Sequence, residues 1–242
     1  MIIIRPEDRV HKFQLLRLLT AIVDNPILSQ EIYFKGGTAA ALLGFLDRFS
    51  VDLDFDLKIG GDKSKIRGEL GKIFKELDLI DDNKNNKTLF FILKYKSLPQ
   101  RRNTIKLSIY EDIVKANNYK AQYIPEIDRQ VQSQTIETMF ANKLVTPIDR
   151  FRKHKKIAGR DIYDIHYFFS QGCEINKEVV EERTKVDVKS YIKILYDFVE
   201  KEVTQTILTQ DLSTLLPVDK FQKIRKILKS EVLLHLRNYP GR

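Results

Sequence analysis

Three aspartates occupy alternate positions in the segment RFSVDLDFDL, residues 48–57. In a β-strand, side chains two residues apart point to the same face, so Asp52, Asp54 and Asp56 share one face and the apolar residues between them share the other. Successive aspartates on that face lie about 7 Å apart, close enough for two carboxylates to bind one divalent cation. Carboxylates suit Mg²⁺, which completes its coordination with water and substrate phosphates. The pattern predicts a metal site for phosphoryl or nucleotidyl transfer; a solvated acidic edge strand is the alternative.

A pair of glycines, Gly36 and Gly37, stands between a short apolar strand and a helix that we expect Thr38 to begin as its N-cap. Glycine lets the backbone approach a ligand closely, and the free N–H groups at the start of a helix favour an anion. The turn therefore suits the phosphates of a nucleoside triphosphate, and Thr38 could add a hydroxyl group. An ordinary structural turn is the alternative. The sequence of glycine turn, short helix and aspartate strand is more specific than either motif alone.

A basic segment at residues 147–160 precedes an amphipathic helix at 161–169. In the helix, Asp161 and Asp164 are three residues apart and share a face. Position alone is also consistent with Asp161 as a first-turn acid that favours the helix dipole. The basic segment is a candidate for binding the phosphates of RNA. Its basic residues are Arg150, Arg152, Lys153, Lys155, Lys156 and Arg160.

The composition narrows the class of protein. Lys and Arg number 42 against 33 Asp and Glu, and the resulting net charge of +9 favours polyanionic partners. The only cysteine, Cys173, cannot form an internal disulfide, and the four histidines are scattered, so we expect oxygen ligands for any metal. No window is apolar enough to span a membrane, and the apolar run at the N-terminus is too short for a secretory signal. We therefore expect a cytoplasmic protein.

Apolar spacing predicts an α+β fold with two domains. Residues 1–115 are expected to form a mixed α/β domain, and residues 116–242 a mainly helical one, with an irregular connection at 116–134. Helices are expected at 8–24, 38–46, 63–78, 135–146, 161–169, 176–201 and 218–238. Strands are expected at 31–34, 51–57, 88–95 and 103–110.

The segment KGGTAAALLGFLDRFSVDLDFDL, residues 35–57, resembles the nucleotidyltransferase signature of the AbiEii-type abortive-infection toxins. These are toxins of bacterial type IV toxin–antitoxin systems with the polymerase-beta-like nucleotidyltransferase fold. The resemblance implies that fold here, followed by a C-terminal helical bundle, with an NTP as substrate. It implies Mg²⁺, or Mn²⁺ in its place, on Asp52 and Asp54, with Asp56 at most a secondary ligand. The residues that it implies for nucleotide binding are Gly36, Gly37, Thr38, Arg48 and Ser50.

Two short segments further along the chain, ANKL at 141–144 and RDIYD at 160–164, resemble a second signature of the same family. This resemblance implies catalytic roles for Lys143 and Asp161, with Asp164 in support. A lysine suits the binding of a triphosphate or of the charge that develops in the transition state. A surface lysine on an amphipathic helix is the alternative for Lys143.

One position departs from the wider fold family. Many polymerase-beta-like enzymes carry a third carboxylate on a later strand, where it commonly takes the proton of the attacking hydroxyl. The candidate strand here, TIKLSIY at 104–110, has Lys106 and Ser108 instead. The proton is then expected to go to Asp161, to solvent or to a metal-bound hydroxide, and Lys106 is a candidate phosphate contact.

The aspartate strand and the glycine turn predict a Mg²⁺-dependent nucleotidyltransferase, and the family resemblance implies a toxin that transfers NMP from NTP to RNA, with the 3′ end of a tRNA as acceptor. An antitoxin encoded by a neighbouring gene is the expected partner. An aminoglycoside-like small molecule or a protein hydroxyl remains open as the acceptor, and so does a catalytically dead module that binds nucleic acid. The basic charge favours RNA, and the intact aspartates and glycines favour an enzyme.

Overall fold

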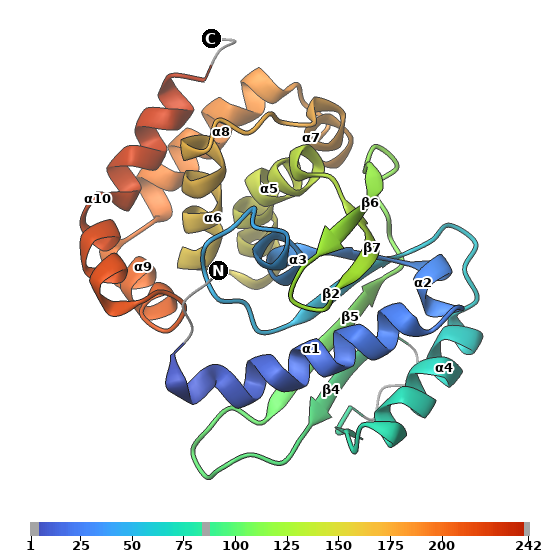
Figure 1. The fold of residues 1–242 in the computed structure, drawn as a ribbon. Coiled ribbons are helices and arrows are strands. Elements are labelled where there is room, and N and C mark those ends of the chain that lie inside the picture. Colours follow the sequence, from blue (N-terminus) through green and yellow to red (C-terminus); the bar gives the residue numbers. More distant parts are fainter. Residues whose placement is uncertain (1–4, 84–87, 240–242) are drawn as a thin grey trace. The chain divides into compact units, whose positions relative to one another are not determined.

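The computed structural model describes residues 5–83 and 88–239 (Figure 1). The chain folds into two compact units. The first unit consists of two stretches of the chain, one ending at Ile113 and one running from Tyr119 to Gln134. The second contains the short intervening segment and everything from Thr135 onward.

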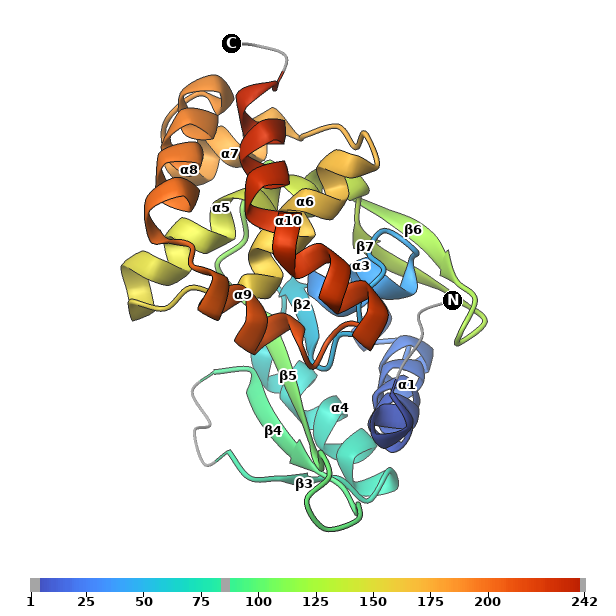
Figure 2. The same cartoon turned by 90° about the vertical axis from the view of Figure 1, so that its left-hand side faces the viewer.

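A mixed sheet forms the first unit. Its strands are β1 (Ile32–Lys35), β2 (Leu53–Leu57), β3 (Ile80–Asp81), β4 (Phe90–Lys94), β5 (Thr104–Tyr110), β6 (Tyr119–Ile124) and β7 (Arg129–Gln134). They lie in the order β3-β4-β5-β2-β1-β7-β6, and β4, β5 and β2 are visible in Figure 2. β2, in the middle, is antiparallel to β1 and parallel to β5. The aspartate strand is therefore the central strand of the sheet.

Helices cover one face of this sheet. They are η1 (Pro6–Asp8), α1 (Arg9–Asp24), α2 (Leu28–Glu31), α3 (Gly36–Leu42) and α4 (Lys63–Glu76). The covered face is apolar: Leu53 and Phe55 of β2 are buried, and the rings of Phe74 on α4 and Phe91 on β4 lie 5.2 Å apart. Strand alternation then places Asp54 and Asp56 together on the opposite face, as the sequence predicts.

The second unit is mainly helical, and, unlike the predicted domain 116–242, it does not include residues 119–134, which belong to the first unit. Its helices are α5 (Ile136–His154), α6 (Gly159–Ser170), α7 (Lys177–Thr184), α8 (Val188–Glu202), α9 (Gln205–Leu212) and α10 (Val218–Arg237). Apolar faces hold them together: the stacked rings of Phe140 on α5 and Phe168 on α6, for example, have centroids 5.1 Å apart. Among the described residues, no helix has both the length and the apolar content to cross a membrane.

Several local expectations were wrong. Residues 119–134 form the hairpin of β6 and β7 and not an irregular connection, because these strands are largely polar and carry little apolar alternation. The expected helix at 176–201 is two helices, separated at Lys185, whose left-handed backbone has φ 63°. The strand expected from residue 51 begins at Leu53, so Asp52 lies just before it.

Candidate active site

Asp54 lies on the central strand, β2, between strands β1 and β5. Its register partners are Lys35 on β1 and Ser108 on β5. Asp52 lies half-buried just before the strand, and its carbonyl oxygen accepts a hydrogen bond from the Thr38 hydroxyl at 2.5 Å. The backbone of the first aspartate is thus tied to α3, which follows the glycine pair.

Gly36 begins α3 and is in direct contact with the second aspartate. Its backbone has a φ of +81°, a conformation that favours glycine, and a Cβ atom placed there would lie 2.7 Å from Oδ2 of Asp54. Glycine is therefore required both by the backbone and by the space that the carboxylate fills. The glycine turn and the aspartate strand, separate motifs in the sequence, meet at this contact.

Gly37 is in contact with Arg48 and Ser50, two further residues that the sequence predicts to bind the nucleotide. A Cβ atom on Gly37 would lie 2.9 Å from Nη2 of Arg48 and 2.9 Å from Oγ of Ser50. Arg48 is only 2% exposed, and its Nη1 donates to the carbonyl oxygen of Phe49 at 3.0 Å. The structure thus brings Gly36, Gly37, Arg48, Ser50 and Asp54 together.

Thr38 does not cap the helix, contrary to the expectation. α3 already begins at Gly36, its N-cap position is Lys35, and no side chain caps it. Thr38 is buried inside the first turn, with its hydroxyl on Asp52. The N-cap therefore lies three residues earlier than expected, and Gly36 tolerates the left-handed conformation with which the helix begins. The hydroxyl therefore supports the aspartate segment.

His11 of α1 was missed by the sequence analysis. Its Nε2–H donates to the carbonyl oxygen of Val51 at 2.9 Å, and its Nδ1 lies 2.7 Å from the hydroxyl of Tyr95. Burial lowers the pKa of His11 to about 4, so the ring is neutral at pH 7. A neutral buried histidine thus holds in place the backbone of Val51, the residue before Asp52. A single histidine in a predicted helix gave no signal of this role.

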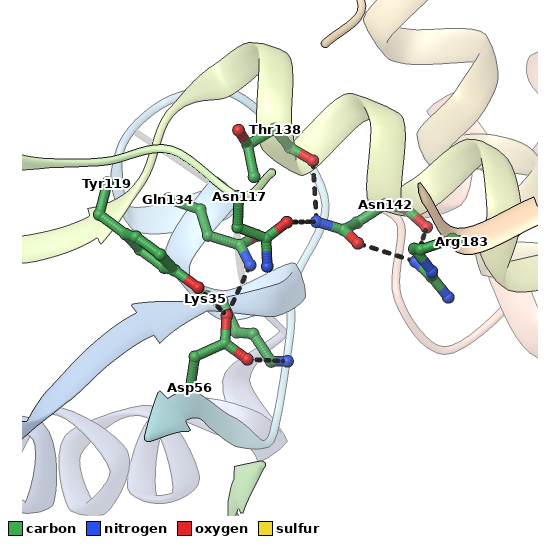
Figure 3. A network of polar contacts seen from close by, with 8 residues as sticks. All are labelled: Lys35, Asp56, Asn117, Tyr119, Gln134, Thr138, Asn142 and Arg183. Carbon is green, nitrogen blue, oxygen red and sulfur yellow. Dashed lines mark hydrogen bonds and ion pairs between the residues drawn. The ribbon is translucent and has the colours of Figure 1, made fainter. Parts of the chain in front are cut away.

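The Asp56 carboxylate is buried and accepts contacts from side chains of three other strands (Figure 3). Lys35 forms an ion pair with its Oδ1 at 2.5 Å, while the Tyr119 hydroxyl and the Gln134 amide each donate to Oδ2 at 2.8 Å. The ammonium group of Lys35 also lies 4.0 Å from the centroid of the Tyr110 ring. With both oxygens engaged, these contacts favour a role in joining strands. The role of secondary metal ligand stays a prediction.

The face of β5 beside Asp54 carries no carboxylate. The residues that alternate on it are Thr104, Lys106, Ser108 and Tyr110, while the residues between them are buried. Lys106 is exposed and directly precedes Leu107, the register partner of Leu53. The strand therefore has a cation and no carboxylate on the face that Asp54 shares.

In the second unit, each carboxylate of the RDIYD motif pairs with a cation on α5. Lys143 lies 2.7 Å from Asp164, whose side chain is fully buried. Arg150 contacts Asp161 through Nε at 2.7 Å and Nη2 at 3.4 Å. Lys143 and Arg150 are two helical turns apart, so the two pairs lie along one face of α5. They join α5 to α6.

Asn142, beside Lys143 in the ANKL motif, links three segments of the second unit (Figure 3). Its amide nitrogen donates to Oδ1 of Asn117 at 3.0 Å and to the carbonyl oxygen of Thr138 at 3.0 Å. Its amide oxygen accepts from Arg183 at 2.8 Å. The asparagine of this motif therefore has a structural explanation that the sequence analysis did not give.

The basic segment is divided between the end of α5 and the turn that follows it. Arg150 and Arg160 are engaged, the latter with Asp211 at 3.6 Å. The other basic side chains of the segment are exposed: Arg152, Lys153, Lys155 and Lys156. Lys155 ends α5 in a left-handed conformation.

A model of the family described as nucleotidyl transferase AbiEii toxin, type IV toxin–antitoxin system, matches residues 17–226. The chain belongs to this family. As an AbiEii-family protein it is a nucleotidyltransferase, with a nucleotide as substrate and an antitoxin as the partner that a type IV system implies. A search of the curated proteins found no match.

Solved structures support the same fold for this AbiEii-family chain. JHP933 from Helicobacter pylori has a TM-score of 0.61 at 19% identity, covering 97% of this chain and 92% of its own. A second H. pylori protein, named as a candidate nucleotidyltransferase, has a TM-score of 0.60 at 21% identity, with 97% and 95% covered. MenT4, a nucleotidyltransferase toxin from Mycobacterium tuberculosis, has a TM-score of 0.53 at 14% identity, with 98% and 87% covered.

The donor set of the AbiEii-family site suits a hard divalent cation. Among the described residues, no group of three or more His, Cys, Asp or Glu side chains is placed to hold a metal ion. Mg²⁺ needs only one or two protein carboxylates when substrate phosphates and water supply the remaining oxygens. The Asp54 carboxylate lies against Gly36 of the glycine turn, and Asp52, two residues earlier and half-buried, is joined to the same helix through its carbonyl oxygen. The residues therefore fit Mg²⁺ bound together with a nucleotide.

Proposed function

We propose that this toxin uses Mg²⁺ to transfer NMP from an NTP to an RNA hydroxyl, with the 3′ end of a tRNA as the acceptor. The observation that carries the proposal is the contact of the Asp54 carboxylate with Gly36, at the first residue of a helix that no side chain caps. A carboxylate in contact with the first residue of a helix that no side chain caps suits a bound metal and phosphate.

The nucleotide phosphates are proposed to bind at the start of α3. Gly36 and Gly37 allow the close approach of a phosphate to the backbone, and the N–H groups of the first turn can donate to its oxygens. Arg48 and Ser50, both against Gly37, would supply a fixed positive charge and a hydroxyl. Thr38 holds the carbonyl of Asp52, so that its contribution to nucleotide binding is to position the aspartate.

Asp52 and Asp54 would hold Mg²⁺, which supplies positive charge to the triphosphate and to the leaving pyrophosphate. In the reaction, the acceptor oxygen forms a bond to the α-phosphorus as the bond to the β-phosphate oxygen breaks. The hydroxyl proton must leave the acceptor at the same time. No carboxylate on β5 can take it, so Asp161 or solvent is the proposed acceptor of that proton.

The resemblance to the second family signature supports catalytic roles for Lys143 and Asp161, with Asp164 orienting the lysine. Asp164 forms an ion pair with Lys143 and so holds that ammonium group in a fixed position. Asp161 would have to release Arg150 before it could accept a proton. These roles rest on the motif match and on these two pairs.

The acceptor is proposed to be RNA because of the net charge of +9 and the exposed cations at the end of α5. Reversing the charge of Lys153, Lys155 and Lys156 by substitution should then weaken RNA binding in a salt-dependent way. The antitoxin is proposed to be encoded by a neighbouring gene.

Transfer of radioactive label tests the proposal. The protein is incubated with Mg²⁺ and each NTP, labelled at the α- or the γ-phosphate, and with total tRNA, an aminoglycoside or a protein mixture. We expect α-label in tRNA, none from γ-label, and no transfer after chelation of the metal. Label from the γ-position would indicate phosphoryl transfer. Label in the small molecule or in protein alone would overturn the RNA acceptor.

A further inference from the structure

A basic hairpin extends from the same end of the sheet as the glycine turn and the aspartates. The basic hairpin comprises residues 94–106, from the end of β4 through the turn to the start of β5, and the turn projects beyond the sheet (Figure 1). β5 runs parallel to β2 with Leu107 beside Leu53, so the residues before each of them lie at one end of the sheet. Asp52 precedes Leu53, and the hairpin precedes Leu107.

The charge of the hairpin has one sign. The segment KYKSLPQRRNTIK contains five Lys or Arg residues and no Asp or Glu. Two of the cations are neutralised by acids nearby: Lys94 lies 2.9 Å from Asp82, and Arg102 lies 3.7 Å from Asp8. The other three cations, which are Lys96, Arg101 and Lys106, are exposed and form no ion pair with any part of the chain that the structure describes.

We propose that the basic hairpin binds the phosphates of the acceptor RNA strand that leads to the reacting hydroxyl. This inference rests on the proposed RNA acceptor. Like charges on one hairpin repel one another unless a polyanion neutralises them. At about 3.3 Å per residue, the stretch from Lys106 to Arg101 spans on the order of 15 Å, which suits several successive phosphates better than one triphosphate. Phosphate contacts of this kind orient a strand without reading its sequence.

RNA binding without NTP tests the inference. The variant is Lys96→Glu with Arg101→Glu, and the matched control is Lys65→Glu with Lys75→Glu, which makes the same change of charge at exposed positions of α4, on the opposite face of the sheet. Binding of a fluorescent RNA with a single-stranded 3′ end is followed by anisotropy from 50 to 200 mM salt. Thermal unfolding checks that both variants fold.

We expect the hairpin variant to bind RNA about tenfold more weakly, with a salt slope shallower by about 1.4, while the control stays within about twofold of wild type. The KM of the hairpin variant for NTP should be the same as that of wild type. Equal loss in both variants would mean a nonspecific effect of net charge and would overturn the inference. If wild type binds and labels RNA while the hairpin variant binds as tightly, the inference fails and the proposed function stands. If wild type binds no RNA, the inference and the RNA acceptor fail together.

Discussion

Replacing Gly36 by alanine should reduce activity far more than it reduces stability. At a φ of +81° an alanine costs about 1–2 kcal/mol, offset in part by about 0.4–1 kcal/mol from the lower freedom of the unfolded chain. The new Cβ would also lie 2.7 Å from Oδ2 of Asp54, so the carboxylate or the turn must move by several tenths of an ångström. Because a misplacement of about 1 Å can cost about a hundredfold in rate, we expect kcat/KM to fall by about ten- to a hundredfold.

Gly44 provides the matched control. Its φ is +77°, and nothing lies within 4 Å of the position of an added Cβ, so Gly44→Ala has the same backbone strain without the contact to Asp54. For a chain of this size, a loss of about 1 kcal/mol lowers Tm by about 2–4 °C. Calorimetry and transfer kinetics on both variants separate strain from site geometry. If Gly36→Ala keeps as much activity as Gly44→Ala, the contact with Asp54 plays no part in the reaction.

Three further outcomes follow from buried groups. The pKa of His11 is about 4 in the folded chain and about 6.5 in the unfolded chain, so the free energy of unfolding should fall by about 3 kcal/mol as pH drops from 6.5 to 4. In urea unfolding, His11→Gln should lack this part of the pH dependence. The same pH dependence in His11→Gln and wild type would contradict the prediction. Asp56→Asn should cost about 3–5 kcal/mol by leaving Lys35 without its anion, while the Mg²⁺ concentration for half-maximal activity stays unchanged; an altered Mg²⁺ requirement would instead indicate a metal ligand. Asp164→Asn should destabilise by a similar amount, and Lys143→Met with Asp164→Leu should regain unfolding free energy but no transfer, whereas regained transfer would exclude a catalytic lysine.

The first motif could be predicted from the sequence because its signals are local. Alternation alone places Asp54 on the polar face of a strand, and a pair of glycines alone marks a close approach of the backbone. The contact between Gly36 and Asp54 depends on the antiparallel register of β1 and β2, which no spacing in the sequence gives. Gly36 and Asp54 could each be predicted from the sequence, whereas the contact between them could be seen only in the folded structure.

The surroundings of the site could not be predicted, because they depend on pairs distant in the chain. Tyr119 and Gln134, which donate to Asp56, lie 63 and 78 residues away from it and come from polar strands with little apolar alternation. His11 lies 40 residues from the carbonyl that it binds. The partner of Asp161, Arg150, was predicted to bind RNA because a run of cations gives no indication of which one forms an ion pair within the chain.

Asp52 and Asp54, at the glycine turn, are the residues that we propose hold the metal for nucleotidyl transfer. Transfer of α-label from NTP to tRNA by Asp54→Asn, compared with wild type at equal folded fraction, tests this proposal most directly. Loss of one charged group of this kind should lower the rate by at least about a hundredfold. Transfer by Asp54→Asn at the wild-type rate would contradict the account.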